Sequence, residues 1–127
     1  MYKVYTSYYA KTKGRSGYDT VYVTVSNTKP HWYDTPHEDM RELSPSWNII
    51  NDYKEGRISY AQFKEAYRNE LISRYETVEN IRELILCRLN VVSEIPIVLL
   101  CWEKNGNECH RTALAEFVFP DEYLGEL

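Results

Sequence analysis

The stretch CWEKNGNECHR, residues 101–111, brings several chemically versatile side chains close together. Cys109 is expected at the start of a helix, where unpaired amides and the helix dipole favour a thiolate that could act as a nucleophile. Glu103 could serve as a general base, and His110 could transfer a proton. The planar guanidinium of Arg111 suits a phosphate or carboxylate. These residue types predict a site for a small anionic ligand, with Glu103, Cys109 and His110 as candidate catalytic residues.

Each of these side chains also has an interpretation without catalysis. The Cys109 thiol could be structural, because reactive thiols need exposure and an electropositive setting. Arg111 could form a salt bridge with a nearby carboxylate, Glu103 or Glu108. Cys101, at the end of a predicted strand, is expected to pack or to contact the ligand rather than to react. A redox disulfide between Cys101 and Cys109 is a further alternative.

Zinc binding is a separate alternative for the same residues. Cys101, Cys109 and His110 are potential zinc ligands, with His31 or His37 as a fourth. Their spacing matches no established zinc finger or knuckle. The sequence therefore predicts no metal site, and it names no cofactor.

Charge and composition narrow the partners. The net charge of -4 and the pI near 5.4 argue against a protein that binds extended nucleic acid through a broad basic surface. Twelve tyrosines and three tryptophans supply flat surfaces with polar tips, which suit stacking on a ligand or a protein interface. A nucleotide or nucleotide-derived group is the expected ligand, and a protein partner is the alternative.

The cellular setting follows from what the chain lacks. No segment reaches the roughly 18 apolar residues that a membrane span needs, and the N-terminus has no apolar core of a signal peptide. Three cysteines without regular spacing fit a reducing compartment better than a disulfide scaffold. We expect a cytoplasmic protein without membrane contact.

Alternating apolar stretches and capping signals predict one α/β domain over residues 1–127. Strands are expected at residues 2–7, 20–27 and 95–102, the last being the central strand because it is almost entirely apolar. Helices are expected at residues 45–55, 59–71, 77–89 and 109–119, with 28–43 as a long loop and 120–127 as a loose tail. The first three have capping signals: Ser44 before Pro45, a capping box of Ser59 and Gln62, and Thr77. This order predicts a small three-layer sandwich with a mainly parallel sheet, Rossmann-like or flavodoxin-like.

The predicted fold also locates the site. In parallel sheets, ligands bind beyond the carboxyl ends of the strands. The loops that leave the three predicted strands should therefore meet at one rim. This reasoning adds six candidate ligand-binding residues: Thr6, Ser7, Tyr8, Trp32, Cys101 and Arg111.

Three segments carry a resemblance to a known family. They are YTSYYAK at residues 5–11, LSPSWNIINDYKEGRISYAQFKEAYRNEL at 43–71 and VLLCWEKNGNECHRTALAEFV at 98–118. With these motifs the chain resembles domain of unknown function 488, a prokaryotic family that includes the YeaO-like proteins. The resemblance implies an α/β fold and a shared site in the last segment, where similar proteins carry a Cys-aromatic-Glu start and a Cys-His-Arg end. It implies no particular reaction.

The sequence therefore favours a small α/β protein that binds a small anionic, nucleotide-like ligand at the segment 101–111 and could act on it. The rival hypothesis comes from another class. In it, exposed tyrosines and a tryptophan, Trp32, Trp47 or Trp102, form a face for a protein partner, and the polar loop is structural.

Overall fold

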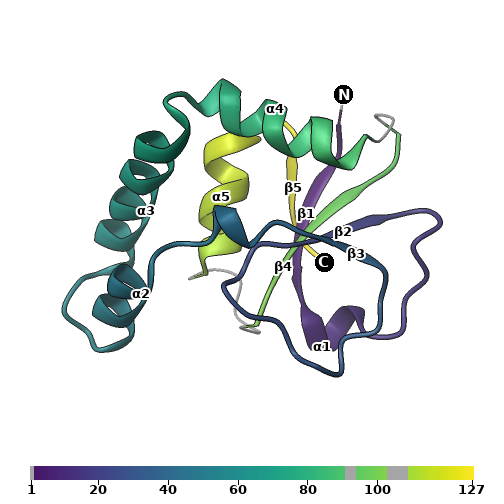
Figure 1. The fold of residues 1–127 in the computed structure, drawn as a ribbon, viewed down its shortest axis with the longest axis horizontal. Helices are drawn as coiled ribbons and strands as arrows, with labels where there is room; N and C mark the ends of the chain where they lie inside the picture. Colours follow the sequence, from purple (N-terminus) through teal and green to yellow (C-terminus); the bar gives the residue numbers. More distant parts are fainter. Residues whose placement is uncertain (1, 91–93, 103–108) are drawn as a thin grey trace.

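A five-stranded sheet forms the centre of the molecule (Figure 1). The computed structural model describes residues 2–90, 94–102 and 109–127. In these residues the strand order is β3-β2-β4-β1-β5, and every neighbouring pair is parallel. The strands are β1 (Val4–Tyr8), β2 (Val21–Thr24), β3 (His37–Asp39), β4 (Ile97–Cys101) and β5 (Tyr123–Glu126).

The predicted central strand is confirmed as β4. All five of its residues are buried, because both faces of the strand are covered. It pairs with β1 on one side, where Tyr8 lies opposite Cys101, and with β2 on the other, where Thr24 lies opposite Leu100. The carboxyl ends of these three strands therefore lie side by side, as the sequence predicts.

In the described part of the chain, five α-helices and one short 3-10 helix connect the strands: α1 (Tyr9–Thr12), η1 (Arg41–Leu43), α2 (Trp47–Lys54), α3 (Tyr60–Tyr75), α4 (Val78–Leu89) and α5 (His110–Val118). The capping box of Ser59 and Gln62 starts α3, and the Thr77 side chain caps α4, as predicted. The predicted loop at residues 28–43 contains β3 and η1. Helix α2 begins two positions later than predicted, after Ser46 rather than Ser44.

The two faces of the sheet are covered differently, which gives three layers. Helices α3, α4 and α5 cover one face with a largely aliphatic core that includes Leu71, Ile85 and Leu114. The other face is covered by α1 and by the segment between β2 and β3, and its core is rich in tyrosine: Tyr9, Tyr22 and Tyr33 with Val98 and Leu100, and Tyr5 packed beside them.

The α/β sandwich with a parallel sheet is thus confirmed. The observed strand order is neither the 3-2-1-4-5-6 order of Rossmann folds nor the 2-1-3-4-5 order of flavodoxins. The likeness to those folds lies in the parallel sheet and its covering layers.

The expected loose tail is wrong, because Tyr123–Glu126 forms the edge strand β5 beside β1. The Leu127 amide extends this pairing by donating a hydrogen bond to the Thr6 carbonyl, with 2.8 Å between N and O. Gly125 has a φ of 115°, a conformation that favours glycine, and it lies in the strand next to a shift in the pairing register. A glycine among charged residues hides the strand from a pattern-based prediction.

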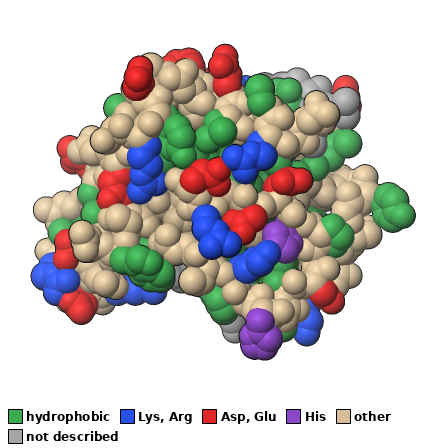
Figure 2. Space-filling model, in the orientation of Figure 1, with side chains coloured by type: hydrophobic (Ala, Val, Ile, Leu, Met, Phe, Trp, Pro, Cys, Tyr) green, Lys and Arg blue, Asp and Glu red, His purple; other side chains and the backbone are tan. Residues whose placement is uncertain are grey.

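The surface carries mixed charge. On the face in Figure 2, Lys and Arg side chains alternate with Asp and Glu side chains and do not form one basic patch.

Cys87 lies beside the apolar stripe of α4, a position that predicts a core residue. In the structure it is exposed and has a free thiol. Within the described ranges, none of the helices has both the length and the apolar character needed to cross a membrane.

Candidate functional site

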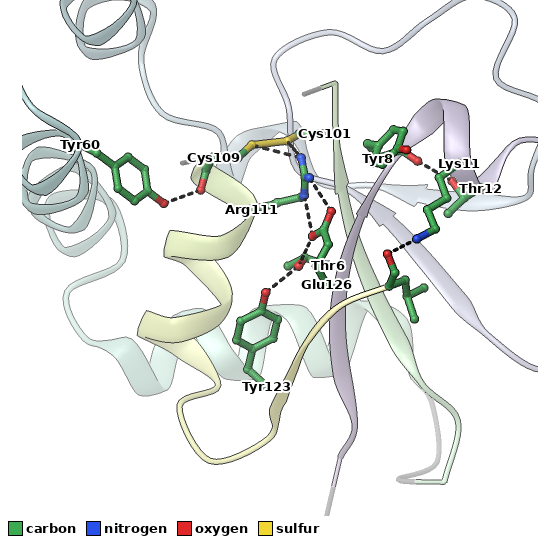
Figure 3. A network of polar contacts seen from close by, with 11 residues as sticks. Thr6, Tyr8, Lys11, Thr12, Tyr60, Cys101, Cys109, Arg111, Tyr123 and Glu126 are labelled. Carbon is green, nitrogen blue, oxygen red and sulfur yellow. Dashed lines mark hydrogen bonds and ion pairs between the residues drawn. A yellow bond between two sulfur atoms is a disulfide. The ribbon is translucent and has the colours of Figure 1, made fainter. Parts of the chain in front are cut away.

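Arg111 is the centre of a buried polar cluster under the start of α5 (Figure 3). It lies on the same face of α5 as Leu114, Ala115 and Val118, at the i+3, i+4 and i+7 positions that face the sheet. Its Nε and Nη2 donate to the Glu126 carboxylate, with distances of 3.2 Å to Oε1 and 2.6 Å to Oε2. The guanidinium is therefore held by a bidentate ion pair rather than presented to solvent.

Glu126 connects this ion pair to the first strand. Thr6 donates from Oγ1 to Glu126 Oε1 at 2.5 Å, and Thr6 Oγ1 and the Tyr123 hydroxyl are 2.6 Å apart. Residues from β1, β5 and α5 thus fix the position of one charge. Because each side chain has a defined partner, the Arg111 fork has a defined direction.

The third nitrogen of the Arg111 guanidinium faces the two cysteine sulfurs. Arg111 Nη1 donates to Cys101 Sγ at 2.7 Å and to Cys109 Sγ at 3.4 Å. Cys101 ends β4, and Cys109 is the residue before the first turn of α5, in extended conformation. The structure joins the two sulfurs in a disulfide, the alternative that the sequence left open (Figure 3). The Tyr60 hydroxyl fixes the helix start by donating to the Cys109 carbonyl at 2.9 Å.

His110 is positioned by the end of β2. Its Nε2 donates to the Val25 carbonyl at 2.9 Å, and its ring meets the edge of Tyr67 with 6.2 Å between centroids. Tyr67 itself is buried, and burial raises the pKa of its hydroxyl, which donates to the Leu43 carbonyl. The Val25 carbonyl and the Tyr67 ring therefore hold the His110 imidazole in a defined orientation.

A pocket of about 510 Å³ opens beside Cys109 and His110. Its walls come from the segment after β2, from α2, from the start of α3 and from the end of β4. The lining residues are Ser26, Asn27, Thr28, Trp47, Ile50, Tyr53, Lys54, Phe63, Trp102, Cys109 and His110. This volume falls within the range of roughly 300–1,000 Å³ found for small-molecule sites.

The lining combines flat apolar surfaces with few polar groups. Trp47 and Trp102 are 54% and 47% exposed, so each presents much of its indole to solvent. Trp102 is nevertheless oriented, because its Nε1 donates to the Thr28 carbonyl at 2.9 Å and its ring lies 5.7 Å from that of Tyr9. With Lys54 on one wall and His110 on another, the pocket can stack a planar ring and attract an anion.

The structure brings some of the predicted site residues together and separates others. Thr6, Cys101, Cys109, His110 and Arg111 lie in or beside the cluster. Ser7 does not, because side chains alternate along β1 and Ser7 faces the tyrosine-rich side, where its buried Oγ has no hydrogen-bond partner among the described atoms.

Three further predictions fall elsewhere. Tyr8 contributes its backbone carbonyl to Thr12, with 3.2 Å between the oxygens, and it does not line the pocket. Trp32 is also outside the pocket lining and lies under the Lys13 ammonium, 5.4 Å from the ring centroid. Glu103 lies outside the described residues.

Sequence reasoning missed Glu126 and the pocket wall that α2 provides. The spacing of Trp47, Ile50 and Tyr53 indicates a helix face, but none of the α2 residues is buried, and Trp47, Ile50 and Tyr53 line the pocket. The available signal was two aromatic residues, Trp47 and Tyr53, on one face of a short predicted helix. Glu126 gave no local signal, because it meets Arg111, 15 positions earlier, only when β5 pairs with β1.

The same geometry gathers potential metal ligands. One ligand atom each from Cys101, Cys109 and His110 lie within 4.8 Å of one another. His37 is not part of this group; its Nε2 is 2.7 Å from Lys29 Nζ and its Nδ1 is 2.7 Å from the Thr35 carbonyl. His31 is exposed and is likewise outside the group that the described residues form.

Comparisons with known proteins give one family. A model described as DUF488-N3a, the active DUF488-N3 subclade, matches residues 8–120. This range includes the pocket walls and the Cys101–Arg111 segment but ends before Glu126. No curated protein and no solved structure gives a significant match.

Proposed function

The chain belongs to the DUF488 family, and we propose that it binds a small anionic ligand of the nucleotide class in the pocket beside Cys109 and His110. The family description calls its subclade active, which favours a site with chemistry over a purely structural domain. The observation that carries the proposal is the combination of aromatic walls, one cationic wall and a helix start around one cavity.

Each part of the pocket has a role in this proposal. The rings of Trp47 and Trp102 offer stacking surfaces to a base, an interaction worth about 1–3 kcal/mol per base in nucleic-acid binding proteins. Lys54 supplies positive charge for a phosphate, and the amides at the start of α5 add to it. Arg111 acts as a positioning residue, because its guanidinium donates hydrogen bonds to Glu126 and to the two sulfurs.

Turnover is a second step of the proposal. In the reduced protein, the Arg111 guanidinium would favour a thiolate on Cys109, which borders the pocket. His110 is held at the same border and could transfer a proton to or from the ligand. Glu103 keeps its proposed role as a general base.

Thermal unfolding with a ligand series tests the binding step. Nucleosides, nucleotides, nicotinamide dinucleotides, inorganic phosphate and simple carboxylates are compared on the same protein. A ligand at about a hundred times its dissociation constant adds roughly 2.7 kcal/mol to the free energy of unfolding, which raises the melting temperature by several degrees. We expect nucleotides to raise it and phosphate alone to have a small effect.

Trp47→Ala locates the ligand. We expect it to lower nucleotide affinity about tenfold or more, because it removes a stacking surface. Tyr18→Ala is the matched control, since Tyr18 is 94% exposed and lies outside the pocket lining. If no compound stabilises the wild type, or if Trp47→Ala binds as tightly as Tyr18→Ala, the pocket is not the ligand site.

The exposed tryptophans also favour a second function, recognition of a protein partner through the aromatic surface around Trp47 and Trp102. In that case Trp47→Ala abolishes capture of the partner, and no small molecule changes the melting temperature. Substitution of Lys54 then changes the salt dependence of capture more than its strength.

A further inference from the structure

We propose that the reduced protein binds one zinc ion through Cys101, Cys109 and His110, beside the aromatic pocket. One ligand atom of each residue lies within 4.8 Å of the others, and both cysteines are buried. This inference does not depend on the identity of the ligand in the pocket. It concerns a site that the sequence spacing alone does not reveal.

The donor set suits zinc. Soft thiolates with an imidazole select Zn²⁺ over Mg²⁺ or Ca²⁺, which prefer oxygen. The Cα atoms of Cys101 and Cys109 are 8.0 Å apart, a wider spacing than the 4.4–6.8 Å usual across a disulfide. With zinc–sulfur bonds of about 2.3 Å in tetrahedral geometry, two cysteine sulfurs stand about 3.8 Å apart, so an ion fits this backbone spacing better than a direct bond.

The surroundings already orient the ligands. His110 Nε2 donates to the Val25 carbonyl, so a neutral His110 ring carries its lone pair on Nδ1. A backbone carbonyl is one of the usual hydrogen-bond partners that orient a zinc-binding histidine. Arg111 Nη1 donates to both sulfurs and lowers the negative charge that they place on the ion.

Charge balance also favours a divalent ion. The positive charge of Arg111 is matched by the carboxylate of Glu126 in a bidentate pair. Two thiolates next to this pair would leave two negative charges in a buried site, which is costly without compensation. Zn²⁺ supplies two positive charges and makes the group of five residues neutral.

The disulfide in the structure and the zinc site exclude each other. A dithiol transfers two electrons and its two protons to the disulfide, which becomes two thiols while the dithiol itself is oxidised to a disulfide. Zinc then binds the two sulfurs as both protons leave to solvent. In the zinc form Cys109 is a metal ligand and not a nucleophile, so metal binding also decides which role this residue has.

The number of ligands has a functional meaning. Structural zinc sites have four protein ligands, whereas catalytic sites have three, including the Cys₂His set, with water or substrate in the fourth position. Cys109 and His110 both line the pocket, so a fourth ligand can reach the ion from there. A zinc ion would polarise an oxygen of that ligand or activate a bound water.

Cobalt substitution of the wild-type protein is the direct test. The protein is reduced with a phosphine, treated with a chelator and desalted without oxygen, and three thiols per chain in denaturant verify reduction. Titration with Co²⁺ should give one ion per chain, with a thiolate-to-cobalt charge-transfer band and the strong visible bands of tetrahedral cobalt. Zn²⁺ should displace it and remain at one ion per chain by elemental analysis. Absence of these bands in fully reduced wild type overturns the proposal.

Single substitutions assign the ligands. Cys109→Ser and His110→Asn should each weaken zinc binding by about 100-fold or more, as loss of a ligand exceeds the 10–100-fold cost of losing a supporting contact. Cys87→Ser is the matched control, because Cys87 is a free, exposed thiol elsewhere on the chain, and it should bind as wild type. Charge-transfer bands of wild-type intensity at wild-type affinity in Cys109→Ser contradict the site.

The outcome stays separate from the proposed nucleotide function. The ligand series is repeated on the reduced protein with zinc and with chelator. Nucleotide stabilisation without stoichiometric cobalt overturns the metal site alone, and stoichiometric cobalt without nucleotide stabilisation overturns the nucleotide proposal alone.

Discussion

The cluster around Arg111 and the pocket around Trp47 meet at Cys109 and His110, yet they are built in opposite ways. In the cluster a buried charge has a named partner for each arm of its fork. In the pocket the side chains are aromatic and partly exposed, and α2 contributes none that is buried. Different residues therefore fix the positions of the two sulfurs and provide affinity for a ligand. The cluster fixes the sulfurs, whereas the pocket provides surface for a ligand.

This comparison predicts that cluster residues affect stability and pocket residues affect binding. The largest effect is expected for Glu126→Gln, which removes the negative charge of the bidentate pair with the fully buried Arg111. Because the Glu126 side chain is 29% exposed, solvent screens part of the loss, and we expect a cost of about 1–3 kcal/mol in free energy of unfolding. Urea denaturation measures this loss.

Glu116→Gln is the control for that experiment. Glu116 lies on the exposed side of α5, so we expect a change within about 0.5 kcal/mol. If Glu126→Gln is as stable as Glu116→Gln, the cluster does not have the structural role that separates it from the pocket.

Lys54→Gln tests whether the pocket provides affinity for a phosphate. We expect affinity for a phosphorylated ligand to fall about tenfold, equivalent to about 1.4 kcal/mol, with the free energy of unfolding unchanged, because Lys54 is exposed on the pocket wall. Binding of the corresponding nucleoside should change little. Isothermal titration with both compounds measures the difference.

Lys3→Gln controls for net charge, since Lys3 is an exposed cation outside the pocket lining. An equal loss in Lys3→Gln and Lys54→Gln means that general electrostatics, and not the pocket, attract the phosphate.

The smallest effect is expected for an ion pair outside both regions. Burial acts to raise the pKa of Asp39, but hydrogen bonds and charge from Arg41 outweigh it and hold this pKa below its usual value. A lowered folded-state pKa stabilises the protein above the unfolded pKa near 3.9, and this contribution is lost as the pH falls through the folded pKa. Arg41→Gln should therefore cost about 0.5 kcal/mol or less at pH 7, because the pair is largely exposed, and nothing at acid pH.

Denaturation of Arg41→Gln and wild type between neutral and acid pH checks this sign. A stability difference that grows as the pH falls would contradict it. Both Asp39 and Glu126 form ion pairs with arginine, but only Glu126 pairs with a fully buried guanidinium, so its substitution should cost more.

Local pattern predicted the elements that depend on local pattern. The apolar run of β4, the capping box of Ser59 and the Thr77 cap are confirmed because each depends on neighbours in the sequence. The strand β5 was missed, because Gly125 and charged neighbours weaken its propensity and its pairing with β1 is a tertiary effect.

The site followed the same rule. The segment from Cys101 to Arg111 was predicted to gather reactive side chains, and its described part does gather the cysteines, His110 and Arg111. That Arg111 points inward was readable from its spacing to Leu114 and Val118 on the buried face of α5. Its partner Glu126 and the wall residue Trp47 were not readable, because only the folded chain brings them to the segment.

Thr6 and Glu126 lie 120 positions apart and share a hydrogen bond in the cluster. Glu126 can occupy this position only when β5 is paired with β1, so the Arg111 guanidinium is directed toward the sulfurs only in a chain whose edge strand is docked. Contacts between residues so far apart in the sequence form slowly, because a long loop must close before they gain anything. The electrostatic setting of the two sulfurs therefore depends on one of the most non-local pairings in the fold.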